Sequence, residues 1–448
     1  MQAIAAGAVA MVATWIAVIH ETTETVRPFS DSLVYLQIAR QPFRIAHFIF
    51  PKPVVTPVIY RALGAELGRI GDFQMGLALV AWSVLGATLI AYLRGRWVRV
   101  LAGVLVAAFV LAPFRVGFMT VALSESIDDS LLALVLAGVI AIANPAFGRA
   151  RTALCWTTAL VAVAWIFTRD TNAITALVAL AVAVSIWRLQ RWAIPLMVLP
   201  AIAAVVALWT TGQRPPLPTG IDEYADWPAE MTARRTYALT SAIVARIGDD
   251  DAARTLFADR GMPQTDQIAT LQHSPATRLS GGEDPRWCCE PTFAPARTWI
   301  DAHGSSAYLA WIGRHLPSRI GEYARAGGEL LAPATLTMYM PAHWKKPRGA
   351  LGLLRSVTGH WLFALLVVVA APWTLWRARA RPLALVAIVC IASAIVGGFF
   401  AYYGDARELS RHMYGAGQQV LLGLVLALLA RLGYPARDAG SASEPTLR

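Results

Sequence analysis

The sequence predicts an all-α polytopic membrane protein, with about ten transmembrane helices and a small, mainly helical domain in the periplasm. Three observations carry this prediction. Hydrophobic residues make up 56% of the 448 residues and charged residues only 15%, far from the composition of a soluble protein. The apolar residues gather in runs of roughly the 20 residues that cross a bilayer. Finally, the connections between runs alternate between arginine-only turns and acid-bearing segments.

Each apolar run is expected to form one span. The first run has no basic segment before it and no convincing small-residue cleavage site after it, so we expect an uncleaved helix and not a signal peptide. The ten runs are 3–20, 74–93, 98–114, 127–143, 152–168, 172–187, 193–211, 359–376, 382–403 and 417–433.

Charge sorting sets the expected orientation. Of the 28 acidic residues, only Asp438 and Glu444 fall on the arginine-rich side of the spans. The positive-inside rule places that side and both termini in the cytoplasm, so the acid-bearing segments face the periplasm. The net charge of +11 is explained by these turns and by anionic lipid, and we expect no nucleic-acid binding. Richness in Ala, Arg and Val, with no N-glycosylation sequon, favours a bacterial inner (cytoplasmic) membrane.

The spans divide the chain into four parts. Residues 1–211 form an N-terminal transmembrane module, whose first periplasmic loop (21–73) reads as proline-broken amphipathic pieces along the membrane surface. Residues 212–358 form the periplasmic domain, with helical periodicity at 231–247, 252–260 and 307–331, the last broken at Pro317. Residues 359–433 form the C-terminal transmembrane helices, and 434–448 a cytoplasmic tail.

Two polar clusters on the periplasmic side carry candidate catalytic acids. Asp31 begins a helix on which Tyr35 shares its face, and it either acts as a general base or only caps the helix. Glu125 enters a span together with Asp128 and Asp129, three carboxylates that exceed what capping requires. A functional and a structural role stay open for Glu125, whereas the structural role is favoured for Asp128 and Asp129.

Two further clusters carry candidate phosphate ligands. Arg169 lies on the periplasmic side against the charge trend, so either its neighbour Asp170 or a lipid-linked phosphate is expected to hold it there. Glu408, Arg411 and His412 share one helical face before the last span. They form either an intrahelical Glu–Arg pair or a phosphate site in which Glu408 orients the two basic side chains.

Together these clusters resemble the C superfamily of integral-membrane glycosyltransferases, in particular bacterial arabinosyl-, mannosyl- and glucosyltransferases. The resemblance implies inverting transfer of a sugar from a polyprenyl-phosphate donor to a periplasmic glycan or glycolipid acceptor. It implies Asp31 as the catalytic base, with Glu125 as the second candidate. It also implies Arg169, Arg411 and His412 as ligands of the donor phosphate, supported by Tyr35, Asp170 and Glu408. Because Asp31 has no adjacent second acid, we expect no cofactor, although a divalent metal stays open.

Two other functions stay open at this stage. An O-antigen-type polymerase or ligase would also span the membrane many times and carry periplasmic Arg and His, but it would not depend on Asp31. A transporter or flippase should show polar or broken spans in two corresponding halves. The apolar runs here are uninterrupted at mid-depth and no two halves correspond, which disfavours transport.

Overall fold

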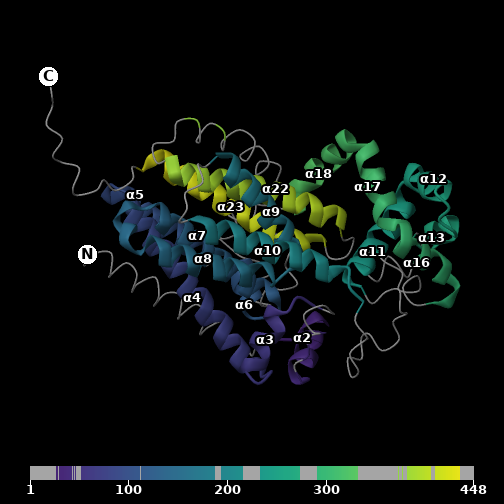
Figure 1. Ribbon diagram of the computed structural model, residues 1–448, viewed down its shortest axis with the longest axis horizontal. Coiled ribbons are helices and arrows are strands. Elements are labelled where there is room, and N and C mark those ends of the chain that lie inside the picture. Colours follow the sequence, from purple (N-terminus) through teal and green to yellow (C-terminus); the bar gives the residue numbers. More distant parts are fainter. Residues whose placement is uncertain are drawn as a thin grey trace.

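The computed structural model shows an all-helical protein (Figure 1). Outside the helices, an isolated β-bridge joins Arg27 and Val121. The expected span 3–20, most of 359–376 and the tail 434–448 lie outside the described residues. The structure describes residues 27–28, 30–42, 44, 46, 52–110, 113–186, 193–214, 233–272, 290–330, 372, 376, 381–404 and 409–433.

Five described helices are long and apolar enough to cross a membrane. Three more, of 15 to 17 residues, coincide with other predicted runs. The predicted all-α, multi-pass membrane fold is therefore confirmed, whereas a total of ten spans stays a prediction. The five long helices are α4 (Leu67–Tyr92), α7 (Ser124–Ala143), α10 (Ile194–Thr211), α22 (Arg381–Gly404) and α23 (Leu409–Leu432). The three shorter ones are α5 (Arg96–Val110), α8 (Arg151–Ile166) and α9 (Asp170–Ile186).

Small residues set the close packing of these helices. Neighbours pack in the order α4, α7, α8, α10, α9, α22 and α23. At the α7–α8 contact, a Cβ atom added to Gly138 would lie 2.1 Å from the Thr158 hydroxyl. At the α9–α22 contact, a Cβ on Gly397 would lie 2.3 Å from the Thr175 hydroxyl. Backbones approach this closely where glycine faces the neighbouring helix, as is common between membrane helices.

One face of α10 has the character of a lipid contact. Val198, Ile202, Val205 and Trp209 recur at helical spacing and are all about half exposed, although every one is apolar. In water such a stripe would be costly, whereas lipid chains cover it without penalty. Trp209 lies in the last turn of the helix, where amphipathic aromatic rings anchor a span at the headgroup level.

The bundle has two ends. The arginine-bearing turns lie at one end, and the acid-bearing connections lie at the other. At the arginine end, α4 is followed by the turn to α5, where Arg99 Nε donates to the Leu93 carbonyl oxygen at 2.8 Å, and Gly433 after α23 lies against Leu93. At the acidic end, α7, α9 and α23 begin and α10 and α22 end (Figure 1). The acid-bearing connections thus meet in space, as the charge pattern predicts.

Three short helices cover the acidic end. They are α2 (Ser30–Arg40), α3 (Val55–Ala62) and α6 (Pro113–Met119). Tyr35 and Tyr60 from α2 and α3 are buried there with Phe118 of α6 and Tyr414 of α23. The Tyr60 hydroxyl donates to Gln74 Oε1 of α4 at 2.8 Å, which fastens α3 to the bundle.

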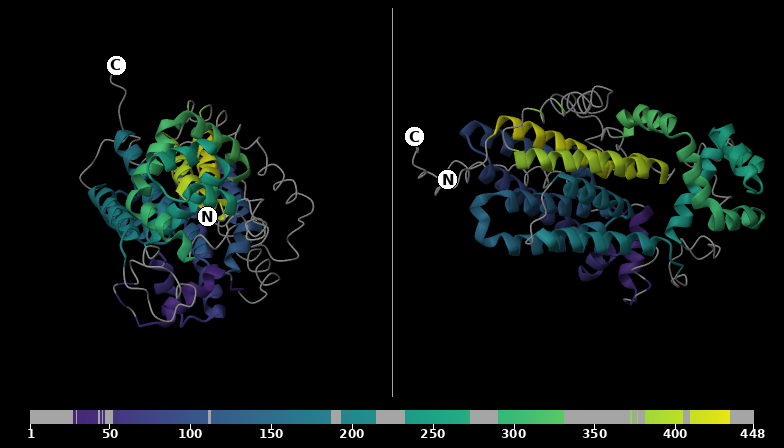
Figure 2. Two further views of the ribbon diagram at one scale, coloured as in Figure 1. Left: turned by 90° about the vertical axis from the view of Figure 1, so that its right-hand side faces the viewer. Right: turned by 45° about the horizontal axis from the view of Figure 1, so that its top comes forward.

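A helical cap, defined here as the helices between 234 and 330, extends from the acidic end (Figures 1 and 2). Its core contains Ile243, Phe257 and Trp311, and it continues into Tyr402 and Tyr403 at the end of α22. Its last two helices are separated at His315, two residues before the proline at which the sequence predicts the break. The main helices of the cap are α11 (Arg234–Asp249), α12 (Asp251–Asp259), α13 (Thr265–Gln272), α16 (Ala294–Trp299), α17 (Ser305–Arg314) and α18 (Leu316–Leu330).

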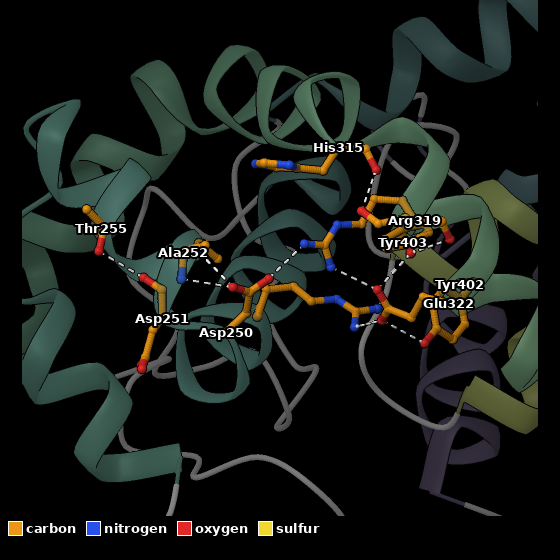
Figure 3. Close-up of polar contacts among 12 residues, drawn as sticks. Asp250, Asp251, Ala252, Thr255, His315, Arg319, Glu322, Tyr402 and Tyr403 are labelled. Atoms are coloured by element: carbon orange, nitrogen blue, oxygen red, sulfur yellow. Dashed lines mark hydrogen bonds and ion pairs between the residues drawn. The ribbon is translucent and has the colours of Figure 1, made fainter.

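Glu322 of α18 connects the cap to the bundle (Figure 3). Its carboxylate accepts from Arg246 Nη1 at 2.7 Å and from Arg319 Nη1 at 2.8 Å. It also accepts from the hydroxyls of Tyr402 at 3.0 Å and Tyr403 at 3.1 Å, both on α22. One carboxylate thereby joins α11, α18 and a membrane helix.

Asp250 extends the same network to α12. Its Oδ2 accepts from Arg319 Nη2 at 2.8 Å, and its Oδ1 caps α12 through the Ala252 and Ala253 amides. Burial alone would raise the pKa of Asp250, but the bonds from Ala253 and Arg319 outweigh it and lower that pKa. Burial likewise opposes ionisation of Glu322, yet Arg246 and Arg319 lower its pKa.

These lowered pKa values predict an acid-sensitive cap. A carboxyl whose pKa is lower in the folded than in the unfolded state stabilises the fold above its unfolded pKa, and this stabilisation is lost as the pH falls through the folded value. Unfolding of purified protein in lipid nanodiscs, followed by hydrogen exchange in α18, should therefore show the cap loosening first below about pH 4. At pH 7 the network should be intact.

Glu322→Gln supplies the variant for this experiment. The amide cannot hold both guanidinium groups, so cap stability at pH 7 should fall by about 1–3 kcal/mol and the acid step should shrink. Glu66→Gln is the matched control, because Glu66 forms an exposed pair with Arg69 that contributes less than about 1 kcal/mol. An unchanged acid step in Glu322→Gln would show that Glu322 does not anchor the cap.

Candidate functional site

The first turns of α7 hold three buried carboxylates at the acidic end. The solvent-exposed fractions of Glu125, Asp128 and Asp129 are only 1%, 3% and 5%. Ionised groups at such depth are unstable unless charged or hydrogen-bonding partners surround them. Glu125 and Asp128 find their partners in residues 168–172, and Asp129 finds its partners on α6 and α23.

Asp129 pairs with a cation that the sequence analysis did not single out. Its Oδ2 accepts from Arg115 Nη1 of α6 at 3.0 Å and from the Tyr414 hydroxyl of α23 at 2.5 Å. Arg115 also donates to Gln418 Oε1 at 2.8 Å, and its guanidinium lies over two aromatic rings. Arg115, like Arg169, is an arginine on the periplasmic side of the expected topology, and that departure from the charge trend is the signal that could have found it.

Glu125 pairs with Arg169, which lies between α8 and α9. The Arg169 Nη1 to Glu125 Oε1 distance is 3.5 Å, and both side chains are buried. Asp170, the neighbour considered as the anion for Arg169, instead forms an ion pair of 3.3 Å with Arg234 of the cap. Two predicted site residues, Glu125 and Arg169, are therefore in direct contact.

Asp128 is held by hydrogen bonds on one of its two oxygens. Oδ1 accepts from Asn172 Nδ2 at 2.6 Å and from the Thr168 hydroxyl at 3.0 Å. Oδ2 lies toward Gly415 of α23, 3.5 Å from where a Cβ atom on that glycine would stand. This fixed carboxylate is one wall of a pocket.

The pocket joins three segments that are distant in the sequence. Its titratable lining residues are Asp128 of α7, Arg169 before α9 and His412 of α23. Its volume, about 20 Å³, is enough for a water molecule, so a larger ligand requires the pocket to widen. The other lining residues are Leu132, Trp165, Thr171, Asn172, Thr175, Gly397, Ala401, Gly415, Ala416 and Gln419.

The predicted base Asp31 lies on α2 and is not a lining residue of this pocket. Its Oδ1 forms an ion pair with Lys52 Nζ at 3.0 Å, and both side chains are mostly buried. Lys52 also lies over the ring of Tyr35, 5.9 Å from its centroid. Asp31, Lys52 and Tyr35 thus form a compact group on the short helices beside the bundle.

Tyr35 connects this group electrostatically to the buried acids. Burial raises the pKa of the Tyr35 hydroxyl, Lys52 lowers it, and the charges of Asp31 and Glu125 raise it further. A single side chain therefore lies within the field of both predicted catalytic acids. The two acids belong to neighbouring parts of the acidic end.

The remaining predicted ligands are described only in part. Glu408 and the side chain of Arg411 lie outside the described residues, so the predicted Glu408–Arg411–His412 face stays a prediction. Of this group only His412 is placed, as a lining residue of the pocket. Among the described residues, no three His, Cys, Asp or Glu side chains converge in a way that could hold a metal ion.

The class that fold and site define is an all-α membrane protein with a charged pocket at one end of its helix bundle. Comparison of the chain with family models, curated proteins and solved structures finds no match.

Proposed function

We propose that this protein is a glycosyltransferase that moves a sugar from a polyprenyl-phosphate donor to a glycan or glycolipid acceptor in the periplasm. The observation that carries the proposal is the pocket shared by Arg169 and His412. These residues are 243 positions apart in the sequence, were both predicted to bind the donor phosphate, and line one pocket at the acidic end.

The basic side of this pocket suits a phosphate. A guanidinium presents N–H donors in a fork that matches phosphate oxygens, and an imidazole adds a further donor when protonated. The three carboxylates and the two guanidinium groups of Arg115 and Arg169 leave the cluster with one formal negative charge. An entering phosphate must therefore contact the Arg169 and His412 side and stay away from Asp128.

The reaction that fits these groups is a displacement at the anomeric carbon. A carboxylate takes the proton of the acceptor hydroxyl, whose oxygen forms the new bond to that carbon from the opposite face. The bond from the anomeric carbon to the phosphate oxygen breaks, and its electron pair leaves with the polyprenyl phosphate, which Arg169 and His412 stabilise. The configuration at the anomeric carbon inverts.

A lipid-linked donor also fits the position of the site. The acidic end is expected to face the periplasm, where nucleotide sugars of the cytoplasm are absent. A polyprenyl chain can diffuse within the bilayer and present its headgroup beside α2 and α3, which cover this end of the bundle. The apolar helices and the charged pocket would then each bind the part of the donor that matches them.

The donor class can be tested with the purified protein. Incubation with a panel of radiolabelled polyprenyl-phosphate sugars and a cell-envelope acceptor fraction should transfer label from one of the donors. Transfer only from a nucleotide sugar would refute the proposal. Transfer only of a whole pyrophosphate-linked oligosaccharide would also refute it, in favour of a polymerase or ligase.

The role predicted for Asp31 is tested by Asp31→Asn. The amide keeps the shape of the side chain but cannot take a proton, so transfer should fall about 10²- to 10⁴-fold while donor binding changes little. Asp72→Asn, which alters an exposed acid near the start of α4, is the matched control and should transfer normally. Normal transfer by Asp31→Asn would leave Glu125 as the predicted base.

A further inference from the structure

The pocket has two chemically different sides. Arg169 offers a positive charge and, with His412, N–H donors, whereas Asp128 offers a carboxyl group. A phosphate oxygen accepts hydrogen bonds and therefore matches the first side better than the second. The part of a ligand that faces Asp128 should therefore be an uncharged group that donates hydrogen bonds.

The geometry of Asp128 suits such a contact. Asn172 and Thr168 both donate to Oδ1, so they fix the orientation of the carboxylate. No hydrogen bond to Oδ2 is found among the described residues, and this oxygen lies toward the lining residue Gly415. Oδ2 of Asp128 is therefore a hydrogen-bond acceptor that already faces the pocket before a ligand binds.

The rest of this wall has the same polar character. Asn172 and Gln419 contribute amides, Thr175 contributes a hydroxyl, and Trp165 contributes an aromatic ring. Amides and carboxylates bind neighbouring hydroxyls, and aromatic rings pack on the apolar face of a sugar. Gly397 of α22 and Gly415 of α23 also line the pocket.

We infer that Asp128 accepts a hydrogen bond from a hydroxyl group of the transferred sugar, and so helps to select the sugar of the donor. This inference rests on the proposed function, since it takes the phosphate of the same donor to bind Arg169 and His412. Asp128 differs in this role from the predicted base Asp31, which lies outside the pocket. The sequence alone favoured a structural role for Asp128.

The test compares two probes on the full-length protein in nanodiscs. The first probe is a polyprenyl monophosphate without sugar, and the second is the same lipid carrying the sugar that transfers best in the donor panel. Asp128→Asn keeps the acceptor for Asn172 and Thr168 but replaces Oδ2 by an amide N–H. Affinity for the sugar-bearing lipid should fall about 10- to 100-fold, while affinity for the sugar-free lipid should stay within about twofold.

Asp129→Asn is the matched control, because it removes the same charge from the next residue, which pairs with Arg115 and does not line the pocket. It should preserve the preference for the sugar-bearing lipid. Equal losses for both probes in Asp128→Asn, no loss for either, or the same selective loss in Asp129→Asn would each overturn the inference while leaving the donor class intact. If the unaltered protein binds neither probe, the proposed function itself fails.

Discussion

The structure depends on surrounding three buried carboxyl groups with polar partners at the end of a membrane bundle. Glu125, Asp128 and Asp129 lie within five residues of one helix and are almost fully buried. Removing a carboxylate from water costs several kcal/mol unless charges and hydrogen bonds compensate. The compensating groups come from α6, from the turn before α9, from α9 itself and from α23. This requirement specifies which helix ends must meet and therefore how this end of the bundle is assembled.

The same requirement produces a site with separated charges. Arg115 and Tyr414 both donate to Oδ2 of Asp129, which does not line the pocket, so these contacts belong to the packing of the bundle. Arg169 balances Glu125 but also reaches the pocket, and Asp128 is held through one oxygen only. Neighbouring residues of α7 thus differ in their surroundings: Asp129 lies within the packing, whereas Asp128 lines the pocket opposite two basic residues.

Sequence patterns determined the coarse fold because apolar runs and charge sorting are local properties. The helices α4, α5, α7, α8, α9, α10, α22 and α23 follow the predicted runs, and the acid-bearing connections meet at one end. The sequence placed Glu125 and Arg169 on the same side of the membrane, but it did not predict that they are in contact. Contacts such as Arg115 with Gln418 join residues 303 positions apart, and no local pattern encodes them. For the same reason Lys52 as the partner of Asp31, and Arg234 as that of Asp170, could not be predicted.

The account requires the acidic end and its pocket to face the periplasm, and cysteine labelling tests this most directly. Single cysteines at Ala258 in the cap and at Ala146 in the turn after α7 are both exposed, and Cys288 and Cys289 would be replaced by Ser in the background. A membrane-impermeant maleimide applied to cells with a permeabilised outer membrane should label position 258 and leave position 146 unlabelled until the inner membrane is opened. Labelling of position 146 but not 258 would put the pocket in the cytoplasm and contradict the account.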